Sequence, residues 1–125
     1  MSHEIILAIV GWREYKDYEE FCRRVAVWIA KYGKPDRIIS GDEPNGTDAM
    51  AKRYAREYGY EFEILVAEWQ KYGKKAGPAR NKLVARRCTH MLAFPSHRGF
   101  GTQSAIGYAR GFHRNVSIKW VDRIE

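Results

Sequence analysis

The chain has 125 residues, of which 45% are hydrophobic and 14% aromatic, enough for one compact core, and this composition excludes an intrinsically disordered chain. Its formal net charge of +7 favours anionic ligands or partners, but it does not choose between nucleotides, nucleic acids and other anionic surfaces. No apolar run approaches the roughly 20 residues that span a membrane, and residues 1–4 begin no secretory signal, so we expect a soluble cytoplasmic protein.

The first half of the chain is expected to form two strands, each followed by a helix. An almost continuous apolar run over residues 4–10 predicts a strand that is buried on both faces and ends at Gly11. Apolar residues then recur at helical spacing as far as Tyr32, after which a glycine and a proline stop the helix. A second short strand is expected over residues 37–40 and a second helix over residues 47–58.

The second half of the chain continues this alternation. The sequence predicts strands over residues 61–67, 90–94 and 116–121, with helices over residues 78–87 and after the glycine-rich turn at residues 99–101. Strands that alternate with helices of this length predict βαβ units and a parallel sheet. The expected fold class is therefore α/β: a single Rossmann-like three-layer domain over residues 1–125, with a mainly parallel sheet of about five strands.

The loops after the first, second and fourth strands hold the unusual residues of this sequence. In a parallel sheet such loops lie together at the carboxyl edge, where ligands bind. Their glycines let a phosphate approach the backbone, and helix N-termini at Thr47 and Thr102 would offer it free N–H groups. Each loop alone is better explained by a tight turn and an ordinary N-cap, but the loops together favour a ligand site. The residues of these loops that we predict to bind the ligand are Gly11, Trp12, Arg13, Gly41, Asp42, Gly46, Thr47, Asp48, Arg98, Gly99, Gly101 and Thr102.

The connection over residues 69–81 mixes aromatic and cationic residues. A ring such as Trp69 could stack on a nucleobase while Lys74 or Arg80 meets a phosphate. The alternative is a basic surface loop with Trp69 tucked into the core. Asn81, one turn into the following helix, has no evident packing role and is a further candidate for ligand binding.

Three segments resemble the YspA-like branch of the SLOG superfamily, in order and within a match that runs from Ile6 to Val116. They read S-G-D-E-P-N-G-T-D-A-M-A from Ser40, E-W-Q-K-Y-G-K-K-A-G-P-A-R-N from Glu68 and F-P-S-H-R-G-F-G-T from Phe94, and the second is the most specific. The resemblance implies a Rossmannoid domain that senses or processes nucleotide-derived ligands. The positions that it implies for ligand contact are Gly11, Arg13, Gly41, Gly46, Asp48, Lys74, Arg80, Asn81, Gly99, Gly101 and Thr102.

Two departures from related sequences bear on catalysis. The related cytokinin-activating phosphoribohydrolases resemble the pattern P-G-G-x-G-T-x-x-E, whose acid serves catalysis, whereas Ala105 falls at that position here and the proline is displaced to Pro95. The first loop of the family often reads G-S-R, but Trp12 stands in place of the serine. We therefore predict a non-catalytic module that senses or sequesters a nucleotide or nucleotide-derived ligand.

Two alternative functions remain open. A nucleotide N-glycosidase or phosphoribohydrolase needs an acid near the glycosidic carbon, and the loops offer Asp48 as the candidate catalytic residue, with Asp42 and Glu43 beside it. Asp48 is explained equally well as an acid that favours a helix start. Single-stranded nucleic-acid binding would suit the positive charge, but the basic residues are spread over several segments and no known motif occurs.

No cofactor and no metal is predicted. Cys22 and Cys88 lie far apart, without the spacing of a zinc site or a disulfide framework. A homodimer that forms through an edge strand or a helix face is left open.

Overall fold

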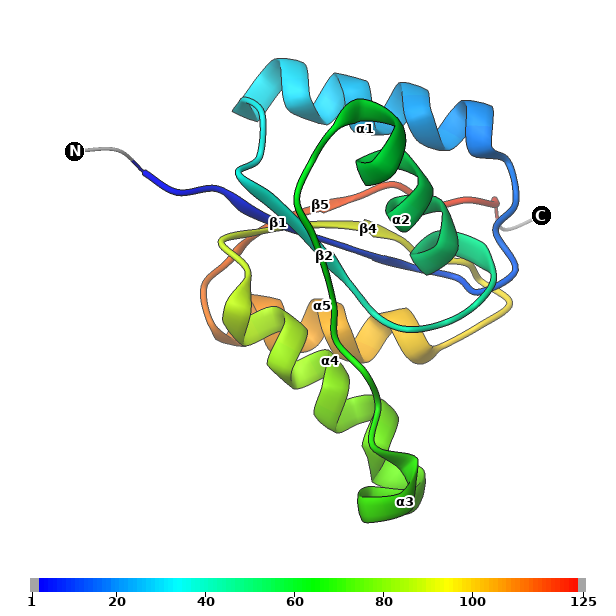
Figure 1. Cartoon of the computed structure of the whole chain (residues 1–125). Helices are drawn as coiled ribbons and strands as arrows, with labels where there is room; N and C mark the ends of the chain where they lie inside the picture. The colour runs from blue at the N-terminus through cyan, green and yellow to red at the C-terminus, as the bar shows by residue number, and fades with distance from the viewer. Residues whose placement is uncertain (1–2, 124–125) are drawn as a thin grey trace.

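The computed structural model describes residues 3–123, so Met1 and Ser2, on which part of the expectation about a leader rests, lie outside it. The strands are β1 (Ile6–Gly11), β2 (Arg37–Ser40), β3 (Phe62–Ile64), β4 (His90–Phe94) and β5 (Asn115–Ile118). The helices are α1 (Tyr18–Tyr32), α2 (Gly46–Tyr58), α3 (Trp69–Tyr72), α4 (Ala76–Arg87) and α5 (Gly101–Gly111), with a 3₁₀ turn η1 (Gly73–Lys75) before α4. A five-stranded sheet lies between α1 and α2 on one face and α4 and α5 on the other (Figure 1). The expected α/β class with a parallel sheet is confirmed.

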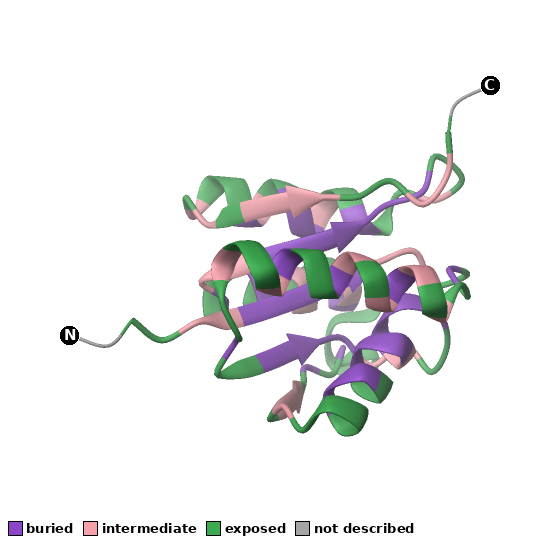
Figure 2. Cartoon of the chain, turned by 90° about the horizontal axis from the view of Figure 1, so that it is seen from above, coloured by how far each residue is buried: buried purple, intermediate pink, exposed green. Residues whose placement is uncertain are grey.

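The core has two halves, one on each face of the sheet. Alternate residues of a strand point to opposite faces, and in β1 Leu7 and Ile9 pack with α1 and α2 while Ala8 and Val10 pack with α4 and α5. Figure 2 shows the central strands buried along their length, with the edge strand β5 only half-buried. Burial on both faces explains why the first strand is apolar at almost every position.

Local signals set where the helices begin and end. The Asp17 carboxylate accepts a hydrogen bond from the backbone N–H of Glu20 and so caps the start of α1. Gly33 and Gly59 follow α1 and α2 with φ angles of 103° and 77°. Glycine adopts such positive φ angles without the steric cost of a Cβ atom, so the chain can turn sharply out of each helix.

The segment between β3 and α4 differs from the expectation. β3 ends at Ile64, so it is shorter than the predicted strand over residues 61–67. The following connection is not an open loop but forms α3 and η1, because the Glu68 carbonyl accepts the N–H groups of Lys71 and Tyr72. α4 begins two residues before Pro78, so that proline still falls in the first turn, where its missing N–H is not needed.

The order of the strands places a crevice at the middle of the sheet. The order is β3-β2-β1-β4-β5, and every neighbouring pair is parallel. The chain builds outward from β1 to β3 on one side and then resumes with β4 on the other side of β1. The loops that leave the carboxyl ends of β1 and β4 therefore diverge, which is where open α/β sheets bind ligands.

Residues 3–123 contain neither a membrane-spanning helix nor a cluster of potential metal ligands. No helix in this range has both the length and the hydropathy needed to cross a bilayer. The same range contains no group of three or more His, Cys, Asp or Glu side chains placed to hold a metal ion.

Candidate functional site

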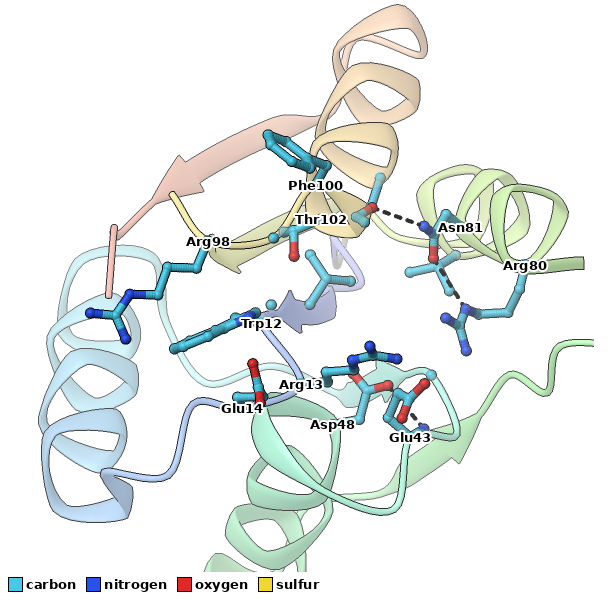
Figure 3. Close-up of a pocket in the computed structure, with 17 residues that line it drawn as sticks. Trp12, Arg13, Glu14, Glu43, Asp48, Arg80, Asn81, Arg98, Phe100 and Thr102 are labelled. Carbon is cyan, nitrogen blue, oxygen red and sulfur yellow. Dashed lines mark hydrogen bonds between the residues drawn. The ribbon is translucent and has the colours of Figure 1, made fainter. Parts of the chain in front are cut away.

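A cavity of about 330 Å³ opens at the carboxyl ends of β1 and β4 (Figure 3). The residues predicted to bind a ligand that line it are Gly11, Trp12, Arg13, Gly41, Asp48, Arg80, Asn81, Arg98, Gly99, Gly101 and Thr102. They come from the end of β1, the loops after β1, β2 and β4, the starts of α2 and α5, and α4, so the fold gathers residues that are up to about ninety positions apart in the sequence. A shared cavity at one edge of the sheet is what the parallel topology predicted.

Five predicted residues do not line the cavity, for two different reasons. Asp42, Gly46 and Thr47 lie directly behind its wall, where they support residues that do line it. Trp69 and Lys74 lie on α3 and η1, exposed to solvent. The side chain of Trp69 is 56% exposed, so the alternative that tucked this ring into the core is wrong.

Some lining residues were not predicted to contact a ligand: Val10, Glu14, Glu43, Val84, Phe100 and Ala105. Glu14 and Phe100 directly adjoin predicted loop residues, so their positions in the sequence carried a usable signal. Val10 and Val84 are core residues whose edges reach the cavity floor, and apolar periodicity does not distinguish such positions from the rest of the core. From the sequence, Glu43 was named only as a possible catalytic acid beside Asp48. Ala105 was named only as the position where the related phosphoribohydrolases have their catalytic acid.

The N-terminus of α5 is open toward the cavity. Within residues 3–123, the backbone N–H groups of Phe100, Gly101 and Thr102 donate no hydrogen bond, and no side chain caps this helix. A Cβ atom built on Gly101 would meet no heavy atom of another part of the chain within 4 Å, so the space beside the first residue of this helix is open. Free N–H groups and the helix dipole make this end attractive to an anion.

At the N-terminus of α2 the N–H group of Thr47 is not free, and the expectation that it would be offered to a ligand is wrong. The carbonyl oxygen of Trp12 accepts hydrogen bonds from both the backbone N–H and the hydroxyl of Thr47, at 3.2 and 2.9 Å. Gly46, with a φ of 72°, brings the helix start against the backbone of Arg13. Thr47 and Gly46 therefore position the loop after β1.

The three arginines of the cavity have different environments. Arg80 is 13% exposed and bonds to Asp42 at 2.7 Å, and Gly41 has no side chain that would block it, since a Cβ there would lie 2.6 Å from Arg80 Nη1. Arg13 and Arg98 are exposed and form no ion pair or hydrogen bond through their guanidinium groups with the residues that the structure describes. Arg13 and Arg98 are thus the cations available to a ligand, while Arg80 is held by the protein.

Asp48 is the buried acid of the site. Its side chain accepts hydrogen bonds from the Ser40 hydroxyl at 2.8 Å and from the Glu43 backbone N–H at 3.2 Å, and the residue is only 9% exposed. Burial raises the pKa of Asp48 above its ordinary value, although these hydrogen bonds and the nearby charge of Arg80 oppose the rise. A carboxyl group in a cleft with a raised pKa is a recognised mark of a functional site, although buried ion networks also produce it.

Asn81 joins the two helices that flank the cavity. Its side-chain amide donates to the Ser104 hydroxyl at 2.8 Å and to the Gly101 carbonyl at 3.3 Å, and its oxygen accepts from Arg80 Nε at 3.1 Å. These hydrogen bonds explain why position 81 carries an amide side chain, for which packing alone gives no reason. Asn81 fixes the start of α5 relative to α4 and so positions the open N-terminus.

The loop between β4 and α5 is held from behind by the C-terminal segment. The Asp122 carboxylate accepts bonds from the Ser96 hydroxyl at 2.5 Å and from the His97 backbone N–H at 2.9 Å. These bonds lower the pKa of Asp122 to about 2. The His97 ring stacks on Trp120 with ring centroids 4.0 Å apart. This anchoring restrains the stretch that leads into Arg98 and the glycine-rich turn.

Comparisons with known proteins agree with the fold. No family model matches the chain. The gene 61 protein of Mycobacterium phage D29 is 32% identical over 113 residues, which cover 82% of this chain and 86% of that protein. The molybdenum cofactor binding protein from the phototrophic bacterium Rippkaea orientalis has a similar structure, with a TM-score of 0.72 and 17% sequence identity over 98% of this chain and 80% of that one. At that identity the structural likeness supports the fold alone.

Proposed function

This chain belongs to the family of the gene 61 protein of Mycobacterium phage D29, and we propose that its cavity binds a nucleotide or nucleotide-derived monophosphate as a sensor or sequestering module. We also propose that the family falls within the YspA-like branch of the SLOG superfamily, on the three sequence segments that resemble it. The structural neighbour is named for binding a molybdenum cofactor, which supports small-molecule binding by a domain of this fold. It does not select the ligand.

The observation that carries the proposal is the two-sided polarity of the cavity. One side presents the open N-terminus of α5, which attracts an anion, and the unpaired guanidinium groups of Arg13 and Arg98 also line the cavity. The opposite side presents the carboxylates of Asp48 and Glu43, which accept hydrogen bonds, with Arg13 beside them (Figure 3). A ligand with a phosphate at one end and sugar hydroxyls at the other satisfies both sides at once.

Two aromatic rings at the cavity could take up a nucleobase. Trp12 lies against Gly99, where a Cβ atom would come within 3.0 Å of the indole, and Phe100 is 80% exposed at the mouth. Flat rings of this kind stack on bases whatever the identity of the base. The volume of about 330 Å³ lies at the small end of ligand pockets, which span roughly 300–1,000 Å³, and so favours one nucleotide over a dinucleotide.

A thermal-shift experiment tests the proposal directly. At about 100 times its Kd, AMP or another nucleoside monophosphate is expected to add about 2.7 kcal/mol of stability, which raises Tm by about 10 °C, whereas the matching nucleosides without phosphate do not. Arg98→Gln is expected to weaken the monophosphate by about 10- to 100-fold, because it removes a charged donor. Arg110→Gln, an equal loss of charge at the other end of α5, serves as the matched control. Equal shifts with nucleosides, or none with any nucleoside phosphate, would refute the proposal.

A second candidate, hydrolysis of an N-glycosidic bond, rests on the buried Asp48. A carboxyl group whose pKa is raised can donate a proton to a leaving base at a higher pH than an ordinary aspartate can. Incubation of the purified protein with AMP and other monophosphates, followed by chromatography for free base, tests this candidate. Release of base that disappears in Asp48→Asn, while the bound phosphate still raises Tm, would establish catalysis. The absence of any release leaves the binding module as the function.

A further inference from the structure

The whole net charge of this protein lies in one segment. Residues 69–87 contain seven lysines and arginines and no aspartate or glutamate, which equals the formal net charge of +7 of the complete chain. Outside this segment, cations and acids balance. The expectation that the basic residues are spread over several segments therefore misses the feature that matters, because only here are they not offset by acids.

This segment, which comprises α3, η1 and α4, is called the cationic arm below; α4 packs against α5 and the sheet, while α3 and η1 project from the body of the domain (Figure 1). Its outer end, α3 with η1, lies beyond the sheet and makes its main contacts with the start of α4 (Figure 1). Of its cations, Arg80 and Arg87 form ion pairs, with Asp42 and Glu63. The exposed lysines at positions 71, 74, 75 and 82 form no ion pair with any residue between 3 and 123.

The outer end of the cationic arm also exposes two aromatic rings. The side chains of Trp69 and Tyr72 are 56% and 45% exposed, and their spacing of three residues puts them on the same face of α3. Lys71 Nζ lies 5.0 Å from the centroid of the Tyr72 ring, so cation and ring already adjoin. Exposure of two large aromatic rings to water is unfavourable for a domain without a partner. Together with the unpaired lysines, these rings suit a partner that has both anionic groups and flat apolar faces.

We propose that the outer end of the cationic arm, α3 with η1, binds single-stranded nucleic acid on residues that do not line the cavity. The phosphates of the strand meet the lysines at positions 71, 74 and 75, and its bases stack on Trp69 and Tyr72. Duplexes keep their base faces stacked inside the helix, whereas a single strand offers both phosphates and exposed bases and so uses both features of the arm. Affinity from this mode depends steeply on salt and little on sequence.

Fluorescence anisotropy of a labelled oligo(dT) strand tests the role of the lysines. The triple variant Lys71→Gln, Lys74→Gln and Lys75→Gln is expected to reduce the slope of log affinity against log salt by about 2, and to weaken binding at about 50 mM salt by roughly 100-fold. The control is Lys16→Gln, Lys34→Gln and Lys52→Gln, which removes the same charge from exposed sites outside the arm. The control is expected to bind within a fewfold of the wild type and with an unchanged slope.

Removal of the rings tests the other half of the proposal. Trp69→Ala with Tyr72→Ala is expected to lower the affinity by at least about tenfold while the salt slope stays unchanged, because stacking releases no counterions. Tyr58→Ala removes a ring of similar exposure elsewhere and is expected to have no effect. Thermal unfolding of each variant shows whether the domain is folded.

Several results would overturn the proposal. These are the absence of measurable binding at low salt, an equal loss in the lysine control, and ring variants that bind as tightly as the wild type. Polyglutamate that displaces the strand as effectively as unlabelled oligo(dT) would also overturn it and would point to an acidic protein. Strand binding that persists with the cavity saturated by AMP is expected, and displacement by AMP would instead assign the strand to the cavity.

Discussion

Gly46→Ala is expected to lower the free energy of unfolding by about 3–5 kcal/mol. Gly46 has a φ of 72°, and a Cβ atom there would overlap the backbone of Arg13. That backbone has little freedom to move, because the carbonyl of the preceding Trp12 accepts both hydrogen bonds of Thr47. Urea denaturation at equilibrium measures the loss.

Gly59→Ala separates the two causes of this loss. Gly59 has nearly the same φ, 77°, but a Cβ atom there would meet nothing within 4 Å. Its replacement is therefore expected to cost only about 1 kcal/mol, which is the price of the left-handed conformation alone. If the two variants lost equal stability, the contact between the start of α2 and the loop after β1 would not be the constraint described above.

The alternation of strands and helices could be predicted from the sequence, because glycines and the spacing of apolar residues determine local structure within a few residues. The strands over residues 37–40 and 90–94 were predicted with their observed bounds, since each is a short apolar run between turn residues. The common cavity could also be predicted, because parallel strands bring every loop after a strand to the same edge. Gly41, Arg80 and Gly101 lie together because of where their loops and helices join the sheet, more than because of the identity of each side chain.

The features of the site that could not be predicted depend on hydrogen-bond and packing partners that the pattern of side chains in the sequence does not reveal. The acceptor that occupies the N–H group and hydroxyl of Thr47 is the backbone carbonyl of Trp12, which any residue would possess. The partners of Asn81 lie about twenty residues further along the chain, on α5. The exposure of Trp69 follows from α3 leaving the sheet, and a helix of four residues is too short to carry a periodic signal. The cationic arm, by contrast, could have been found by counting acids segment by segment.

Gly101→Asp is expected to weaken a nucleoside monophosphate by at least about 100-fold while leaving the fold intact or slightly more stable. The new carboxylate would occupy the open space in front of the N-terminus of α5, since nothing lies within 4 Å of its Cβ position. An acid at a helix N-terminus stabilises the helix by interacting with the same N–H groups and dipole. It therefore competes with the phosphate for these groups and repels it, at a cost of several kcal/mol.

Two variants distinguish charge from shape in this prediction. Gly101→Asn has nearly the same size without the charge and is expected to weaken the monophosphate far less, by about tenfold or less, because it can still cap the helix. Gly107→Asp adds the same charge to α5 at another glycine with open space around it, and binding there is expected to stay within about twofold of the wild type. Calorimetric titration with AMP measures affinity, and thermal unfolding without ligand measures stability. Full affinity in Gly101→Asp would show that the phosphate does not lie at this helix end, because no ligand anion could share those N–H groups with a fixed carboxylate.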